Sequence, residues 1–241
     1  MTCIGESIND NGGNIEMTGG MSSHGYGGSM QLLSGKSTKM GSGSILIASE
    51  DSGPSGSSGS LTLSSGSSTL GSSGSISIST GMSNTGSGGD ILLSVGTGQE
   101  RAEGGNIRLK AGDIVNASDY RGGEISLLTG KSNMHGSGDF SINTAAAGKS
   151  GDSGSISMST GSTETGSSGQ VTIQTGDATE GNGGNIILQV GATSTTEDSF
   201  DGANGGSISL NAGETKNRRR SGGNVTLGGG DGNYFMSQVL F

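Results

Sequence analysis

The sequence predicts an all-β fold, a parallel β-solenoid (β-helix) of about fourteen coils with 15–16 residues and one strand in each coil. Three observations predict it: a recurring apolar pair, the short interval between pairs, and a glycine-rich composition. In each copy a glycine and a polar residue precede two large apolar residues separated by one position, as in Gly74-Ser75-Ile76-Ser77-Ile78. The pairs are Ile15/Met17, Met30/Leu32, Ile45/Ile47, Leu61/Leu63, Ile76/Ile78, Ile91/Leu93, Ile107/Leu109, Ile125/Leu127, Phe140/Ile142, Ile156/Met158, Val171/Ile173, Ile186/Leu188, Ile208/Leu210 and Val225/Leu227.

The interval between pairs excludes repeats that contain helices. The first residues of successive pairs are mostly 15 or 16 positions apart, with three longer intervals of 17, 18 and 22. Ankyrin, tetratricopeptide and leucine-rich units need roughly 20 to 35 residues each. Each repeat therefore has the length for strands and turns only.

The composition argues against a conventional globular core. The chain has 52 Gly and one Pro among 241 residues, and only 27% of its residues are hydrophobic. A flexible Gly/Ser linker is the alternative for such a composition. A flexible linker would not require an apolar residue at both positions of all fourteen pairs. The repeat therefore favours an ordered solenoid.

The pattern within one repeat predicts a strand between two glycine corners. Alternation places Ile76 and Ile78 inside the coil and Ser77 outside. A glycine precedes every strand, and a second follows most of them, where positive φ or close backbone approach would exclude a side chain. Small polar residues such as those at 67–69 would form the opposite wall and leave no cavity.

The chain divides into three parts on this interpretation. Residues 1–11 would form an N-terminal partial coil or cap, residues 12–233 the β-solenoid, and residues 234–241 an apolar C-terminal cap or assembly segment. Strands stacked at about 4.8 Å would make a rod roughly 65 to 70 Å long. Because the repeat is already running at residues 12–13, we expect the chain to be a piece of a longer precursor.

The ends of such a rod expose parallel strand edges, which template further strands unless they are covered. The C-terminal segment could fold back as a cap, continue as a truncated coil with Val239 inside, or reach the first coil of another copy near Ile4 and Ile8. We therefore expect self-association end to end. The candidate assembly residues are Phe235, Val239, Leu240 and Phe241.

Charge and cysteine content limit the partners. The 21 acidic and 12 basic residues give a net charge of −9, which argues against nucleic acid or an anionic membrane as the main partner. Cys3 is the only cysteine, so no disulfide can form within the chain. The sequence contains no stretch as apolar as a membrane span, and residues 1–10 lack the pattern of a signal peptide.

Three longer loops follow Gly112, Gly191 and Gly213. Acidic residues in the second loop and basic residues in the third would lie one coil apart and form a surface ion-pair cluster, or the arginines would contact an anion or glycan. The acidic residues are Glu197, Asp198 and Asp201, and the basic residues are Lys216, Arg218, Arg219 and Arg220. Asn116 and Asn224 fit the N-glycosylation pattern.

Patterns typical of enzymes fail at required positions, so we expect no catalytic residue, cofactor or metal. Gly148-Lys149-Ser150 lacks the earlier glycine of a phosphate-binding loop, because Asn143 stands there. His24 and His135 have no second ligand at metal spacing. Three carboxylates share an outward column that could bind calcium, but other residues separate them. They are Asp90, Glu124 and Asp139.

Ice binding is the main alternative function. In architecture alone, the predicted solenoid resembles antifreeze proteins with coils of this size, which present flat ranks of threonine. The outward column between the apolar pairs contains eight hydroxyl residues among fourteen, but only three are threonine, and Arg108 interrupts it. The column is Glu16, Gln31, Leu46, Thr62, Ser77, Leu92, Arg108, Ser126, Ser141, Ser157, Thr172, Ile187, Ser209 and Thr226.

The phrase Gly-Ser-Ile-Ser-Ile-Ser-Thr-Gly at 74–81 resembles the Gly/Ser/Thr-rich repeat regions of surface and cell-wall proteins of diatoms and related algae. The resemblance spans nearly the whole chain and implies an extracellular or cell-surface location. The resulting prediction is a non-enzymatic structural or adhesive module of a fibre, stalk or adhesin, with itself and surface polysaccharide as partners. Ice binding is second, and a carbohydrate-binding solenoid is third.

Overall fold

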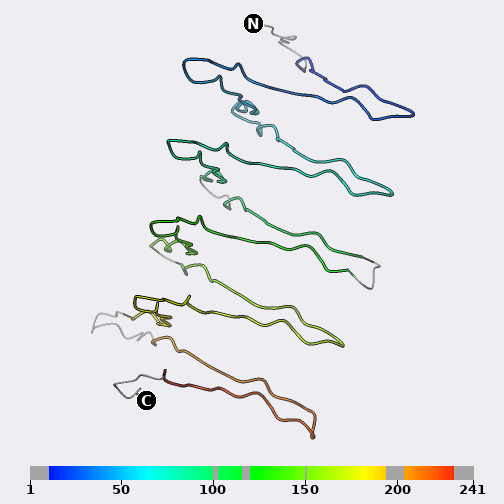
Figure 1. Ribbon diagram of the computed structural model, residues 1–241. Coiled ribbons are helices and arrows are strands. Elements are labelled where there is room, and N and C mark those ends of the chain that lie inside the picture. Colours follow the sequence, from blue (N-terminus) through cyan, green and yellow to red (C-terminus); the bar gives the residue numbers. More distant parts are fainter. Residues whose placement is uncertain (1–10, 100–102, 116–119, 150, 194–203, 231–241) are drawn as a thin grey trace. The chain divides into compact units, whose positions relative to one another are not determined.

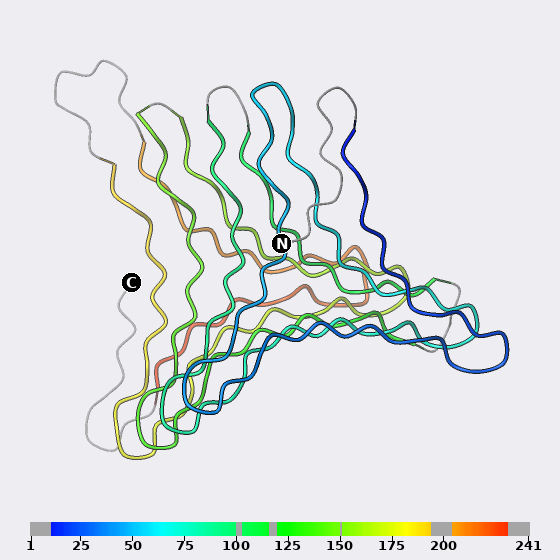
Figure 2. The ribbon, with the colours of Figure 1, turned by 90° about the horizontal axis from the view of Figure 1, so that it is seen from above.

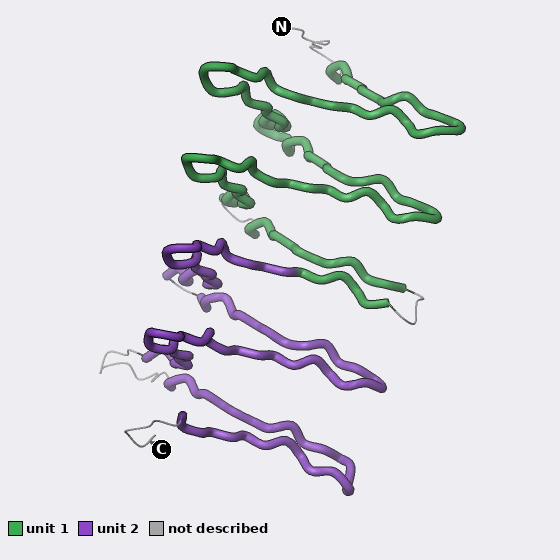
Figure 3. Tube along the Cα trace, viewed as in Figure 1, with its two compact units in different colours: residues 1–125 green, residues 126–241 purple. Residues whose placement is uncertain are grey.

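The computed structural model describes residues 11–99, 103–115, 120–149, 151–193 and 204–230. These residues contain neither helix nor strand, so there are no elements whose bounds could be given. The parallel β-solenoid stays a prediction. The chain consists of extended segments, each carrying one apolar pair, joined by corners at which its direction reverses (Figure 1). It divides into two units, Met1–Ile125 and Ser126–Phe241 (Figure 3).

Serine and threonine hydroxyls shape the corners. The Ser22 Oγ accepts a hydrogen bond from the Gly25 N–H at 2.9 Å, and Ser83 does the same for Gly86 at 2.9 Å. Short hydroxyl side chains bond to nearby backbone in this way and compete with helix or sheet. The same contact over three residues recurs from Met40 to Ser37, Gly71 to Ser68, His135 to Ser132 and Gly166 to Thr163.

The two ends of each described corner come together at a neck, which a backbone hydrogen bond closes in several of them. In the first corner the Gly28 N–H donates to the Gly20 oxygen at 2.8 Å, eight residues earlier. Equivalent backbone bonds run from Gly43 to Gly35, Gly123 to Gly112, Gly138 to Gly130 and Gly223 to Gly213. Each of these corners is thus a closed loop between two extended segments.

Within each unit, every third corner points in the same direction. In unit 1 the corners at 21–27 and 67–73 share one direction, and those at 36–42 and 82–88 share another (Figures 1 and 2). In unit 2 the corners at 131–137 and 177–183 behave alike. Three repeats therefore complete one turn inside a unit, whereas the predicted solenoid assigns one repeat to each coil.

None of the side chains in the described ranges is buried. The apolar pair residues are nevertheless less exposed than apolar residues between them: Ile45 and Ile47 expose 49% and 58%, and Leu46 exposes 89%. Leu92 and Ile187, which stand between the two residues of their own pairs, are likewise more exposed than those pairs. In these three repeats, the two sides of the segment therefore differ in the direction that the alternation predicts.

Candidate functional site: the apolar faces

Each extended segment has an apolar face of three residues, which we define as the apolar pair and the residue two positions after it. This third member shares the face of the pair because side chains alternate along an extended chain. It is small or β-branched throughout the described repeats. The third members are Gly19, Ser34, Ser49, Ser65, Thr80, Val95, Ala111, Thr129, Thr144, Thr160, Thr175, Val190, Ala212 and Gly229.

The third member packs at the neck against the glycine that opens the next segment. A methyl group placed on Gly105 would lie 2.6 Å from Cγ1 of Val95, and one on Gly206 would lie 2.7 Å from Cγ1 of Val190. Where the third member is threonine, its hydroxyl also reaches the neck: Thr160 Oγ1 donates to the oxygen of Gly169 at 3.3 Å. Sequence reasoning missed this residue, although the period of two continues through it.

These contacts explain the glycine before some of the segments by close approach, as at Gly105 and Gly206. At Gly43, Gly74 and Gly89 a methyl group would make only ordinary contacts, the nearest at 3.5–3.6 Å. Among the described glycines, only Gly151 has a positive φ, at 126°. The expectation is wrong for the second glycine of the repeat: Gly35, Gly81 and Gly130 have no positive φ, and a methyl group on any of them would lie in open space. The structure gives no steric reason for glycine there.

Substituting the neck glycine tests this packing. A methyl group on Gly28 would lie 2.9 Å from the backbone nitrogen of Gly20, whereas one on Gly27 meets the Gly20 oxygen at an ordinary 3.6 Å. We expect Gly28→Ala to lower the free energy of unfolding by about 1–3 kcal/mol, because backbone atoms must move apart. Gly27→Ala should be neutral or raise it by about 0.4–1 kcal/mol. Denaturant titrations that show equal losses for both variants would contradict the close neck.

The apolar faces carry no charge. Every residue of the three-residue faces is apolar, glycine, serine or threonine. Charged side chains lie at corners or at other positions of the segments, as for Lys36 and Lys39, and Lys110 forms an ion pair with Asp113 in which both side chains are exposed. Contact between two apolar faces would therefore bury no ionised group.

The three arginines of the proposed anion or glycan contact lie in a tight turn. The Arg219 N–H donates to Oδ1 of Asn217 at 3.0 Å, and the Arg220 N–H donates to the Asn217 oxygen at 3.1 Å. Arg218 lies in the same turn, and all three residues are exposed. The acidic residues of the expected ion-pair cluster lie outside the described residues, so the cluster stays a prediction. They are Glu197, Asp198 and Asp201.

The remaining candidates divide between described and undescribed parts of the chain. Asn224 is exposed directly after the neck glycine Gly223. Asn116 and the C-terminal segment, with Phe235, Val239, Leu240 and Phe241, lie outside the described residues, as do Ile4 and Ile8. Nothing in the structure tests their predicted roles.

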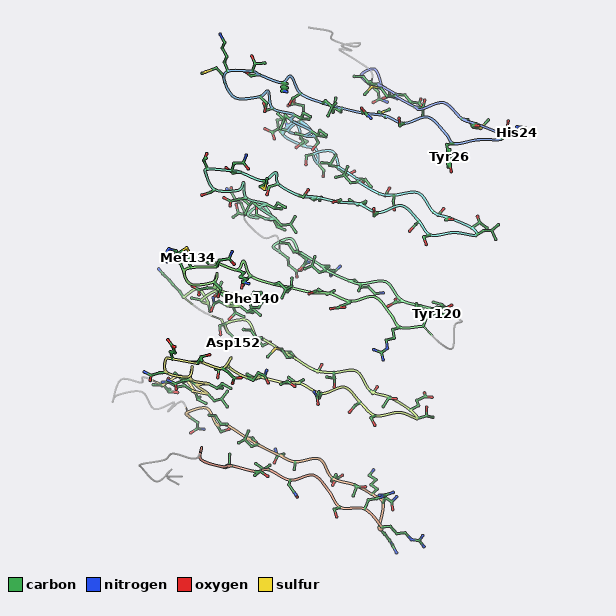
Figure 4. All side chains as sticks on the ribbon, in the orientation of Figure 1. His24, Tyr26, Tyr120, Met134, Phe140 and Asp152 are labelled. Carbon is green, nitrogen blue, oxygen red and sulfur yellow. The ribbon has the colours of Figure 1, made fainter. Side chains whose placement is uncertain are left out.

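The two histidines lie on corners of different units. His24 is at the tip of the first corner, where its Nδ1 is 2.9 Å from Oγ of Ser23 (Figure 4). His135 belongs to unit 2. Over the described ranges, no group of three His, Cys, Asp or Glu side chains gathers as a metal site would require. The described part of the chain also holds no helix of the length and apolarity that crossing a bilayer demands.

Comparison with known proteins finds no matching family, no matching curated protein and no matching solved structure. The resemblance to algal surface repeats therefore stays a prediction from the sequence.

Proposed function

We propose that the chain is a non-enzymatic structural or adhesive module of an extracellular or cell-surface protein. Its proposed form is a rod of stacked parallel strands, the β-solenoid that the repeat predicts. The observation that supports this most is the uncharged apolar face, repeated in every segment and exposed in the single chain. Exposed faces of this kind release free energy when they stack, about 1.5–3 kcal/mol for each large side chain buried.

The regularity of the chain supports a mechanical role over a chemical one. Catalysis needs unlike groups brought to one point, such as a nucleophile, a base and an oxyanion donor. Here the same small set of groups recurs, mostly at intervals of 15–16 residues, with serine and threonine hydroxyls shaping several of the corners. Such repetition suits spanning a distance, coating a surface or presenting many equal contacts to a polysaccharide.

Ice binding draws less support from the outward column. A regular lattice match needs flat ranks of similar hydroxyl residues. Leu46 and Leu92 stand in this column and are 89% and 85% exposed, and Arg108 adds a charge. The column therefore offers an irregular surface to ice.

The proposal includes end-to-end assembly through the C-terminal segment. Open strand edges at the end of a rod add further strands at about 4.8 Å, and a head-to-tail contact does not close, so the product is a filament. We expect electron microscopy to show filaments of the full chain and isolated rods after deletion of residues 234–241. The deletion removes the apolar residues Phe235, Val239, Leu240 and Phe241 from the joint.

Other outcomes would contradict this proposal in distinguishable ways. Filaments that persist after the deletion would exclude the segment as the joint, and isolated rods in both samples would exclude assembly. Thermal hysteresis with faceted ice crystals at micromolar protein would favour ice binding. A specific glycan-array signal that is lost when Arg218, Arg219 and Arg220 are replaced by alanine would favour a carbohydrate-binding solenoid.

A further inference from the structure

In the described parts of a single chain, the large apolar residues of the extended segments stay exposed, and backbone groups between the necks make no hydrogen bond with another segment. Hydrogen bonds in the described ranges join residues at most 11 positions apart, and backbone pairing occurs at necks and tight turns. Ile76 and Ile78 are 56% and 69% exposed. The next segment on the same side of a unit lies three repeats further along the chain. No hydrogen bond in the described ranges joins residues that far apart in sequence.

The coil geometry limits what can occupy these faces. A partner must offer extended strands whose apolar residues recur every 15–16 positions, and it must change direction at each repeat as this chain does (Figure 2). A short peptide or a flat surface satisfies only one segment. A second copy of the chain satisfies all of them, because its repeat and its corners are the same.

Symmetry sets the number of copies. Since three repeats make one turn within a unit, rotating a copy by a third of a turn brings each repeat to the direction of the next one. We propose that three copies of the chain intertwine about a common axis, so that each repeat stacks on the following repeat of another copy. Closed threefold symmetry makes the three copies equivalent.

This arrangement satisfies the groups that the single chain leaves exposed. On any one side of the coil, strands from the first, second and third copy would follow one another at about 4.8 Å before the first copy returns. Backbone N–H and C=O groups then pair across copies, as buried peptide groups require. The apolar faces meet inside, and their lack of charge allows three copies of net charge −9 to pack without burying an ionised group.

The corners are compatible with this stacking. They project away from the segments (Figure 2). They carry exposed polar side chains, including Lys36, Lys39 and the turn with Arg218. At each neck, the third face residue of one segment contacts the glycine that opens the next segment, as Val95 contacts Gly105. The inference goes beyond the proposed structural role, which holds equally for a rod of one chain or of three.

Disulfide trapping between successive repeats distinguishes the two kinds of rod. Ser77 and Leu92 occupy the outward central position of neighbouring repeats, and in stacked parallel strands their Cα atoms would be about 4.8 Å apart, within disulfide range. The full chain with Ser77→Cys, Leu92→Cys and Cys3→Ser is oxidised with diamide and analysed on a denaturing gel without reductant. Three intertwined copies predict a covalent trimer of about 70 kDa, three times 23.5 kDa.

Each copy forms one disulfide with each of the other two copies, so the three copies are linked in a closed ring. End-to-end association of rods would therefore not enlarge the covalent product. A control chain with Ser77→Cys, Arg108→Cys and Cys3→Ser, whose positions are two repeats apart, should stay unlinked. A disulfide confined to the monomer would overturn the inference in favour of one chain stacking on itself, and would leave the proposed structural role intact. Free thiols in the Ser77→Cys and Leu92→Cys chain would overturn the proposed register.

Discussion

Replacement of Ile78 by aspartate is expected to unfold the central repeats, with a loss of about 3–5 kcal/mol, because stacking would bury an uncompensated charge. In the single chain Ile78 is 69% exposed, where a carboxylate would cost little. The size of the loss therefore reports whether the apolar face is covered. It is measured by denaturant titration followed by circular dichroism.

Ser77→Asp is the matched control for this variant. Ser77 is the neighbouring residue on the outward side of the same segment, and the substitution adds the same charge. We expect a change within about 0.5 kcal/mol, as for exposed substitutions in general. Equal losses for the two variants would show that the assignment of inside and outside is wrong.

The local features of the fold could be predicted from the sequence, because they depend on a few neighbouring residues. The glycine before a segment marks a close approach in some repeats, as at Gly28, and the alternation places Leu46 and Leu92 on the more exposed side. The third face residue, such as Thr80 or Val95, was also predictable, since the period of two continues to it. It falls outside the predicted apolar pair because it is a small or polar residue in most repeats.

The direction of each corner could not be predicted. It results from the summed backbone angles of the residues between two necks, and a small change at each of them turns the next segment to another side. Hydrogen bonds such as those of Ser22 and Ser83 close the corners without setting that direction. The number of repeats in a turn, and with it the identity of the stacking partner, is consequently a property that a linear pattern does not contain.

The candidate site residues were predictable to different degrees for a similar reason. The turn that holds Arg218, Arg219 and Arg220 follows from a local signal, the asparagine at 217 whose side chain and carbonyl accept backbone hydrogen bonds. Pairing of these arginines with acidic residues one repeat away depends on how loops of unequal length meet. The sequence contains no direct signal for that distance.

Hydrogen–deuterium exchange measured by mass spectrometry tests most directly the central claim that the repeated apolar faces are the interior of a strand stack. Stacked strands hydrogen-bond the backbone N–H groups of each segment, whether the neighbour belongs to the same chain or to another copy. Peptides that contain Ile76 and Ile78 should then exchange at least about a thousandfold more slowly than the corner at 83–86, and the pattern should recur every 15–16 residues. Fast and uniform exchange along segments and corners alike would contradict the account.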